Sequence, residues 1–149
     1  MPVFELKVKC VVCYLLFDVR LNRLCCCDKG GVMYKDLKVY QSAMDLCVVI
    51  YELTRKLPYE ERYGLVSQMR RCAVSVPSNI AEGAGRRSFR EQVRFYYIAR
   101  GSLAELETQL ELCFRLGYIC EQSMINTKQT YQLLNGLIRS TNRRTTNSE

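Results

Sequence analysis

Apolar residues recur every three or four positions along most of the chain, from residue 34 to about residue 139. This spacing places them on one face of an α-helix. Pro58 and Gly117 are helix-ending residues between such stretches. Four helices are predicted, over residues 34–57, 61–85, 88–116 and from Cys120 or Ser123 to about 139. Because the connections are short, we predict an all-α fold, an antiparallel up-down-up-down four-helix bundle.

The first predicted helix carries two apolar sets side by side. One set is Leu37, Tyr40, Met44, Cys47 and Tyr51. The other set is Ala43, Leu46, Ile50, Leu53 and Leu57. Together they form an arc wider than one seam of a bundle needs. Either the helix is deeply buried, or one face packs inside and the other meets another subunit.

The second predicted helix contains a proline within its apolar pattern. Pro77 has no N–H and pushes on the carbonyl of Ala73, so we expect a kink there. Asn79 is a candidate for fixing the register of the helices through buried hydrogen bonds. Gly83 and Gly85 are expected to end the helix. A polar stripe, which is either a solvated face or a subunit surface, comprises Arg71, Ser75, Ser78 and Glu82.

The third predicted helix has a start signal and a long heptad pattern. Ser88 and Glu91 match the S-x-x-E capping box, in which each side chain bonds one of the first free N–H groups. Strict heptad spacing relates Phe89, Tyr96, Leu103 and Leu110. This pattern favours bundle packing at shallow crossing angles.

The two ends of the chain lack this pattern. Residues 1–32 hold five of the nine cysteines, and their apolar run is too short to span a bilayer as a helix. Zinc is the weaker interpretation of these cysteines, because the three adjacent ones at 25–27 cannot easily all reach one tetrahedral ion. We expect a Cys-rich extension, either unrelated to the fold with Met33 as the natural start or packed on the main domain as a hairpin or arm. Residues 33–140 are then the bundle, and residues 141–149 a disordered tail.

Composition argues against an enzyme. The chain has no histidine, the commonest general base and metal ligand. Its one acidic cluster, Glu105, Glu107 and Glu111, lacks the E-x-x-H of di-iron bundles, and no glycine-rich phosphate loop follows a strand. We therefore predict no catalytic residues, no metal and no cofactor. The cysteines at 47, 72, 113 and 120 are expected to be core thiols without disulfides, as in a reducing cytoplasm.

Positive charge suggests a partner instead. The net charge is +7, and residues 70–100 contain seven arginines against two glutamates. Arg90, Arg94 and Tyr97 share one helical face, where arginine matches phosphate oxygens and tyrosine can stack on an unpaired base. The candidate nucleic-acid-binding residues are Arg70, Arg71, Arg86, Arg87, Arg90, Arg94 and Tyr97. A solvated basic face is the alternative.

Several segments together resemble a known family. They are VSVPSNIAEG at 74–83 with GRRS at 85–88, DLKVY at 36–40, ERYGL at 61–65, GSLAELETQL at 101–110 and LNGLI at 134–138. The chain resembles, over about residues 34–139, the bacterial four-helix-bundle proteins encoded in intervening sequences of large-subunit ribosomal RNA genes. Arg100 stands where that family more often has an apolar residue. The structural motif residues of the resemblance are Pro77, Asn79, Glu82 and Gly83.

The resemblance implies a homopentamer and carries over no catalytic residue. It also implies distant kinship with the accessory protein of diversity-generating retroelements, a basic pentamer that binds RNA and a reverse transcriptase. We therefore expect a non-catalytic, oligomeric, cytoplasmic protein that binds RNA and has no membrane partner. The alternative is a homo-oligomeric scaffold, which would show no salt-sensitive affinity for nucleic acid.

Overall fold

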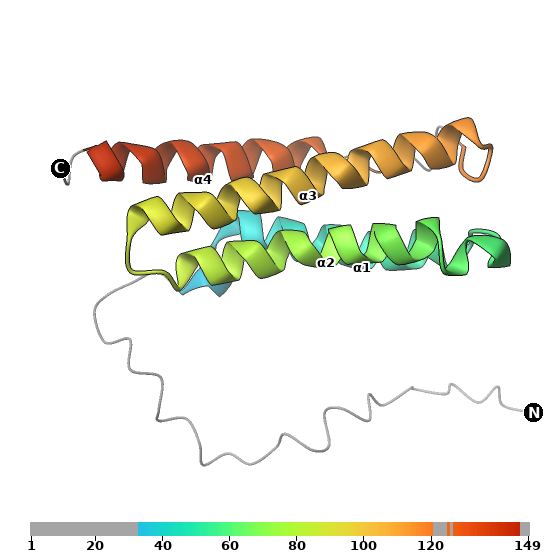
Figure 1. Cartoon of the computed structure of the whole chain (residues 1–149), viewed down its shortest axis with the longest axis horizontal. Helices are drawn as coiled ribbons and strands as arrows, with labels where there is room; N and C mark the ends of the chain where they lie inside the picture. Colours follow the sequence, from blue (N-terminus) through green and yellow to red (C-terminus); the bar gives the residue numbers. More distant parts are fainter. Residues whose placement is uncertain (1–32, 121–124, 126, 147–149) are drawn as a thin grey trace, which may run out of the picture. The chain divides into compact units, whose positions relative to one another are not determined.

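The computed structural model describes residues 33–120, 125 and 127–146. Within these residues the regular structure is helical, without strands. It comprises η2 (Tyr34–Asp36), α1 (Lys38–Thr54), η3 (Tyr59–Arg62), α2 (Leu65–Ala84), α3 (Phe89–Arg115) and α4 (Lys128–Thr146) (Figure 1). The predicted all-α four-helix bundle is confirmed. The predicted Cys-rich extension at 1–32 lies outside the described residues.

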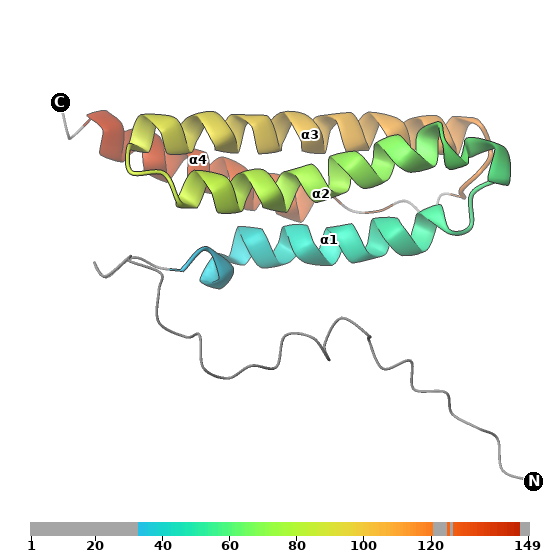
Figure 2. The same ribbon diagram turned by 60° about the horizontal axis from the view of Figure 1, so that its bottom comes forward.

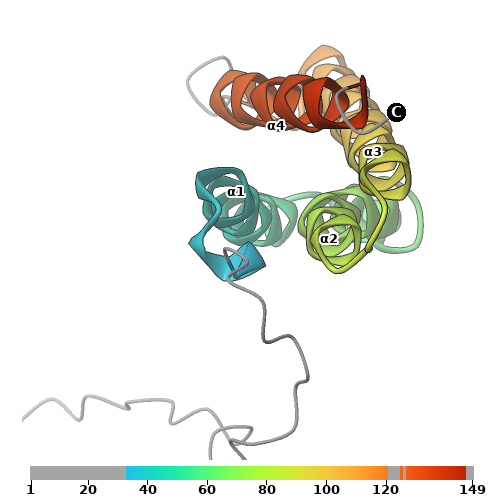
Figure 3. The ribbon, with the colours of Figure 1, turned by 90° about the vertical axis from the view of Figure 1, so that its left-hand side faces the viewer.

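The helices follow one another around a common core, with α2 lying between α1 and α3 (Figure 2). Seen end-on, α1 and α3 lie diagonally opposite each other, and α4 completes the bundle beside α3 (Figure 3). Where α3 and α4 contact each other, residues later in α4 lie beside residues earlier in α3. Thr127, just before α4, bonds Glu107 of α3, and further along α4 Asn135 bonds Arg100.

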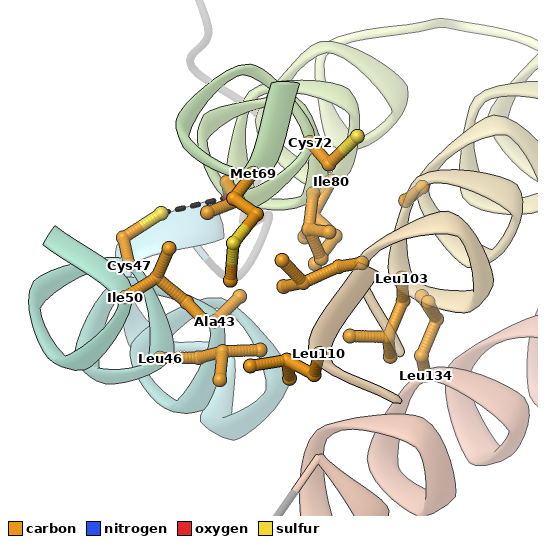
Figure 4. Close-up of a cluster of buried hydrophobic side chains, with 14 of the residues drawn as sticks. Ala43, Leu46, Cys47, Ile50, Met69, Cys72, Ile80, Leu103, Leu110 and Leu134 are labelled. Atoms are coloured by element: carbon orange, nitrogen blue, oxygen red, sulfur yellow. Dashed lines mark hydrogen bonds between the residues drawn. The ribbon is translucent and has the colours of Figure 1, made fainter. Parts of the chain in front are cut away.

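The core is built from side chains of all four helices, including Ile50, Met69, Leu103, Leu110 and Leu134 (Figure 4). On α1 the buried face is the set that contains Ala43, Leu46 and Ile50. Met44 and Tyr51 of the other set are 42% and 39% exposed. Among the described residues α1 is therefore not deeply buried, which corrects that interpretation. Cys47 of the second set is buried, and the open apolar face comprises Met44, Val48 and Tyr51.

Pro77 lies inside α2, and the helix continues through it from Leu65 to Ala84. Because proline has no N–H, the carbonyl of Ala73 lacks its usual donor four residues along. The thiol of Cys47, on α1, donates a hydrogen bond to that carbonyl at 2.7 Å (Figure 4, dashed line). Burial raises the pKa of Cys47 to about 11, so the thiol stays protonated and able to donate. A side chain of α1 thus supplies the bond that Pro77 removes.

Gly83 does not end α2, which corrects the prediction from the sequence. It is a buried residue inside the helix, and a Cβ atom there would lie 2.6 Å from Cε1 of Tyr96. Glycine therefore allows α2 to approach α3 closely at this point. The helix ends at Ala84, and the N–H of the next residue, Gly85, bonds carbonyls of the last turn.

Other helix ends also differ from the prediction. Ser88 is the N-cap of α3, but its side chain makes no capping hydrogen bond, so the predicted capping box is not formed. The side chain of Gln92 instead donates a hydrogen bond to the carbonyl of Arg86 at 2.8 Å, which links the first turn of α3 to the loop before it. Cys120 is exposed and is not a core thiol.

α4 begins at Lys128 and continues to Thr146, so it starts and ends later than predicted. Thr141 is 5% exposed, and its hydroxyl donates to the carbonyl of Leu137. Arg144 lies over the ring of Phe89, at the start of α3. These contacts hold the last turns of the helix in place, which corrects the predicted disordered tail for residues 141–146. Residues 147–149 lie outside the described part.

Candidate nucleic-acid interface

The predicted arginines form two separate groups. Arg71 lies in the first half of α2, whereas Arg87 follows its end. An α-helix rises about 1.5 Å per residue, so about 20 Å of helix separates Arg71 from Ala84. Arg70 and Arg71 therefore do not share a surface patch with the arginines around the α2–α3 turn.

Arg70 and Arg86 both contact other side chains of the bundle. The guanidinium of Arg70 lies 4.9 Å from the ring centroid of Tyr51, and its Nε donates to the hydroxyl of Thr54 at 2.9 Å. Arg86 pairs with Glu82 and lies 4.6 Å from the ring centroid of Phe95. Both arginines already have partners within the chain, and the Glu82–Arg86 pair is solvent-exposed, so it contributes little stability.

Three further arginines are exposed at the start of α3. Arg87, Arg90 and Arg94 all have exposed side chains. Arg90 and Arg94 line a shallow groove together with Tyr97, which is 43% exposed. We call these four residues, Arg87, Arg90, Arg94 and Tyr97, the α3 basic surface.

A second groove lies between α3 and α4 and shares Tyr97 with the first. Arg100 also lines it from α3. The lining residues from α4 are Gln132, Asn135, Arg139 and Asn142, with Ile138 between them. We call this the α3–α4 groove.

Arg100 is the link between the two walls of the α3–α4 groove. Its guanidinium lies 4.7 Å from the ring centroid of Tyr97, and its Nη1 donates to Oδ1 of Asn135 at 3.4 Å. The α4 wall was not predicted from the sequence. One signal for it was available, because residues 128–146 contain four basic residues and no acidic one.

Asn79 acts within the bundle. Its amide donates to the carbonyl of Ser75 at 2.8 Å and to the Ser75 hydroxyl at 3.0 Å. The Ser75 hydroxyl in turn forms a 2.8 Å hydrogen bond with the hydroxyl of Ser102 on α3. Ser75 of the predicted polar stripe therefore faces α3, and Asn79 orients the bond that joins α2 to α3.

The acidic and thiol side chains are dispersed. Glu107 accepts a hydrogen bond from Thr127, and Glu111 pairs with Arg115. Burial raises the pKa of Cys72 and of Cys113, which makes their thiols poor nucleophiles. Among the described residues, no three Cys, Asp or Glu side chains lie close enough together to hold a metal ion. None of the described helices is long and apolar enough to cross a membrane.

These features define a class of protein, a helical bundle with a basic and partly aromatic face over α3 and α4. The family model of the 23S rRNA-intervening sequence proteins matches residues 35–140, and the chain belongs to this family. A comparison with curated proteins gives no match.

A solved structure shares the fold. It is a protein of unknown function from the S23 ribosomal protein family of Bacteroides thetaiotaomicron. The two chains are 24% identical, with a TM-score of 0.62 over 68% of this chain and 95% of the other. At this identity the likeness supports the helical fold and carries no function to this chain.

Proposed function

We propose that this chain is a non-catalytic RNA-binding protein of the cytoplasm and that it holds RNA through the α3 basic surface. The observation that carries the proposal is the exposure of three arginines beside a half-exposed tyrosine on successive turns. Guanidinium groups bind phosphate oxygens in a fork geometry, and a tyrosine ring can stack on a base. The buried thiols of Cys47, Cys72 and Cys113 form no disulfide, which suits a reducing compartment.

The members of the family are named after intervening sequences in 23S ribosomal RNA, a name that describes where they are encoded and not what they bind. Binding to phosphates is expected to dominate over recognition of sequence, because the surface supplies mainly charge. Three phosphate contacts to single-stranded RNA predict a slope of about −2 for log K against log salt concentration. A fourfold rise in salt then weakens binding by roughly 20-fold.

The test is fluorescence anisotropy of a labelled RNA that contains a hairpin and single-stranded flanks, titrated with the full chain from 50 to 200 mM salt. The variant R87A/R90A/R94A should lose most of the affinity and flatten the salt slope by about 2. The matched control K35A/R55A/K56A removes the same charge from exposed positions outside α3 and α4. Equal losses in both triple variants, or no binding at 50 mM salt, would overturn the proposal.

One observation favours a second function, a homo-oligomeric scaffold. Met44, Val48 and Tyr51 lie on one face of α1 at helical spacing, and Val48 is 57% exposed. A contiguous exposed apolar face often marks a protein–protein contact. A second copy is the occupant we propose, since the resemblance implies a homopentamer. Light scattering should give a multiple of the 17.3 kDa chain mass, reduced by V48K but not by the exposed control variant Q129A. A monomeric wild-type chain would refute this scaffold.

A further inference from the structure

The α3–α4 groove has walls of different chemistry. Tyr97 and Arg100 of α3 form one wall as a stacked pair, with 4.7 Å between the guanidinium carbon and the ring centroid. The other wall belongs to α4. There Gln132, Asn135, Arg139 and Asn142 follow at steps of three, four and three residues, which places them on one helical face.

We infer that the α3–α4 groove binds one unpaired base of a single-stranded RNA segment whose phosphates lie along the α3 basic surface. The inference rests on the proposed function and adds to it the kind of RNA and the place of one base.

The stacked wall supplies a platform for the base. Bases stack on tyrosine rings and on arginine guanidinium planes when they are unpaired and splayed out. Tyr97 is already aligned by Arg100, so little ordering is needed when a base arrives. The exposed part of Tyr97 opens to both grooves, because the residue lines each of them.

The α4 wall supplies donors and acceptors for the edge of the base. Each side-chain amide of Gln132, Asn135 and Asn142 has an NH2 donor and a carbonyl acceptor. Oδ1 of Asn135 accepts from Arg100, and its amide nitrogen can donate into the groove. Such amides pair with the donor and acceptor positions of a base edge, as in the contacts that asparagine and glutamine make with adenine.

Charge favours an anionic occupant. The residues lining the groove include Arg100 and Arg139 and no carboxylate. Over its whole length α4 has four basic residues and no Asp or Glu. An acidic peptide would satisfy this charge, and its backbone would pair with the amides, but its carboxylates have no flat ring to stack on the wall of Tyr97 and Arg100.

The two surfaces are continuous through Tyr97. On α3, Arg94 lies three residues before Tyr97 and Arg90 seven, which is about 4.5 and 10 Å along the helix axis. A strand whose phosphates contact these arginines therefore passes the mouth of the groove. A paired base has both faces covered by its neighbours, so a duplex cannot place a base there.

The experiment compares two RNAs of equal length with the full chain. One is an unstructured adenine-rich strand and the other a blunt hairpin whose loop is a non-nucleotide linker, so that every base of the hairpin is paired. Y97L should weaken binding to the strand by about tenfold to a hundredfold, because one base loses its stacking partner. The same variant should change hairpin binding less than twofold, and Y97F should keep the affinity for the strand.

A spectroscopic measurement places the base. A 2-aminopurine in the strand should lose fluorescence on binding to the wild-type chain, and Y97L should restore it. N142A should weaken strand binding several-fold, whereas the control Q129A, an exposed α4 position that does not line the groove, should not. Circular dichroism checks that each variant folds.

The outcomes separate the inference from the proposed function. Equal losses of strand and hairpin binding in Y97L, or unchanged 2-aminopurine fluorescence, would overturn the inference while RNA binding stands. Failure of the wild-type chain to bind either RNA would remove the proposed function and the inference with it. Tight binding of an acidic peptide that competes with the strand and is insensitive to Y97L would assign the charge to a protein partner and overturn the inference.

Discussion

Replacing Cys47 with alanine removes the donor that serves the carbonyl of Ala73. The thiol lies 2.7 Å from that oxygen, and Pro77 stands at the position whose N–H would otherwise bond it. Ala73 is buried, so a carbonyl left without a donor costs about 1–3 kcal/mol of unfolding free energy. Loss of the packed sulfur adds a cavity cost of about 1 kcal/mol. We therefore expect C47A to destabilise the chain by about 2–4 kcal/mol.

A double-mutant cycle isolates the hydrogen bond from the cavity. P77A restores an N–H at the position that can bond Ala73, so C47A in the P77A background should cost only the cavity part. The expected coupling energy between the two changes is about 1–3 kcal/mol, measured by urea unfolding at one protein concentration. C113A is the matched control, because Cys113 is also buried and its thiol contacts the sulfur of Met69 at 3.6 Å, away from Pro77. Coupling below about 0.5 kcal/mol would refute the idea that the thiol replaces the missing N–H.

Three further predictions concern the bundle. G83A should lower the unfolding free energy by about 1–3 kcal/mol, because its Cβ would press on Tyr96. G101A should raise the unfolding free energy by about 0.5–1 kcal/mol, because a Cβ there meets nothing within 4 Å. Thermal melts measure both variants, and equal effects would contradict the close approach of α2 to α3 at Gly83. The pKa of Cys47 rises from 9.0 to about 11 on folding, so the contribution of this thiol to the unfolding free energy is complete below pH 9 and is lost as the pH rises to 11. The loss is about 3 kcal/mol at most. The difference in unfolding free energy between wild type and C47A should therefore fall over this pH range, and an increase would contradict the prediction. Removing all residues after 140 should destabilise the chain by about 1–2 kcal/mol in urea unfolding, because Thr141 is buried and Arg144 lies over the ring of Phe89; an unchanged unfolding free energy would contradict this.

Helical periodicity predicted the number of helices and the start of α3, because a repeated spacing determines which residues share a face. It could not show which residues of the two apolar sets of α1 are buried, since both sets satisfy the same spacing and only the neighbouring helices decide. Cys47 of one set is buried, whereas Met44 and Tyr51 of the same set are exposed. The close packing of Gly83 against Tyr96 could not be predicted for a related reason. Glycine near a helix end favours a C-cap, but the approach of Tyr96 from another helix determines its use here.

One part of the candidate site also follows from the sequence, and the other part does not. Arg90, Arg94 and Tyr97 belong to one helix, so their common face follows from the sequence. Arg139 and Asn142 come beside Tyr97 only through the register of α4 against α3, which the packing of both helices on the core determines. The partners of Arg70 could not be foreseen either, because Tyr51 and Thr54 belong to a different helix.

The open apolar face of α1 lies toward α2, because the guanidinium of Arg70 on α2 lies over the ring of Tyr51, whereas the groove is lined from α3 and α4. In the bundle α1 and α3 are diagonally opposite (Figure 3). Copies joined through α1 would therefore leave each groove accessible and present several of them to one RNA. Linked weak sites raise the overall affinity by 10- to 10,000-fold when one ligand can span them. V48K should thus weaken binding of a long single strand strongly and leave binding of a strand of about ten nucleotides unchanged. Anisotropy titrations with both strands measure this, and an equal loss for the two lengths would mean that Val48 affects the groove of each copy and not their assembly.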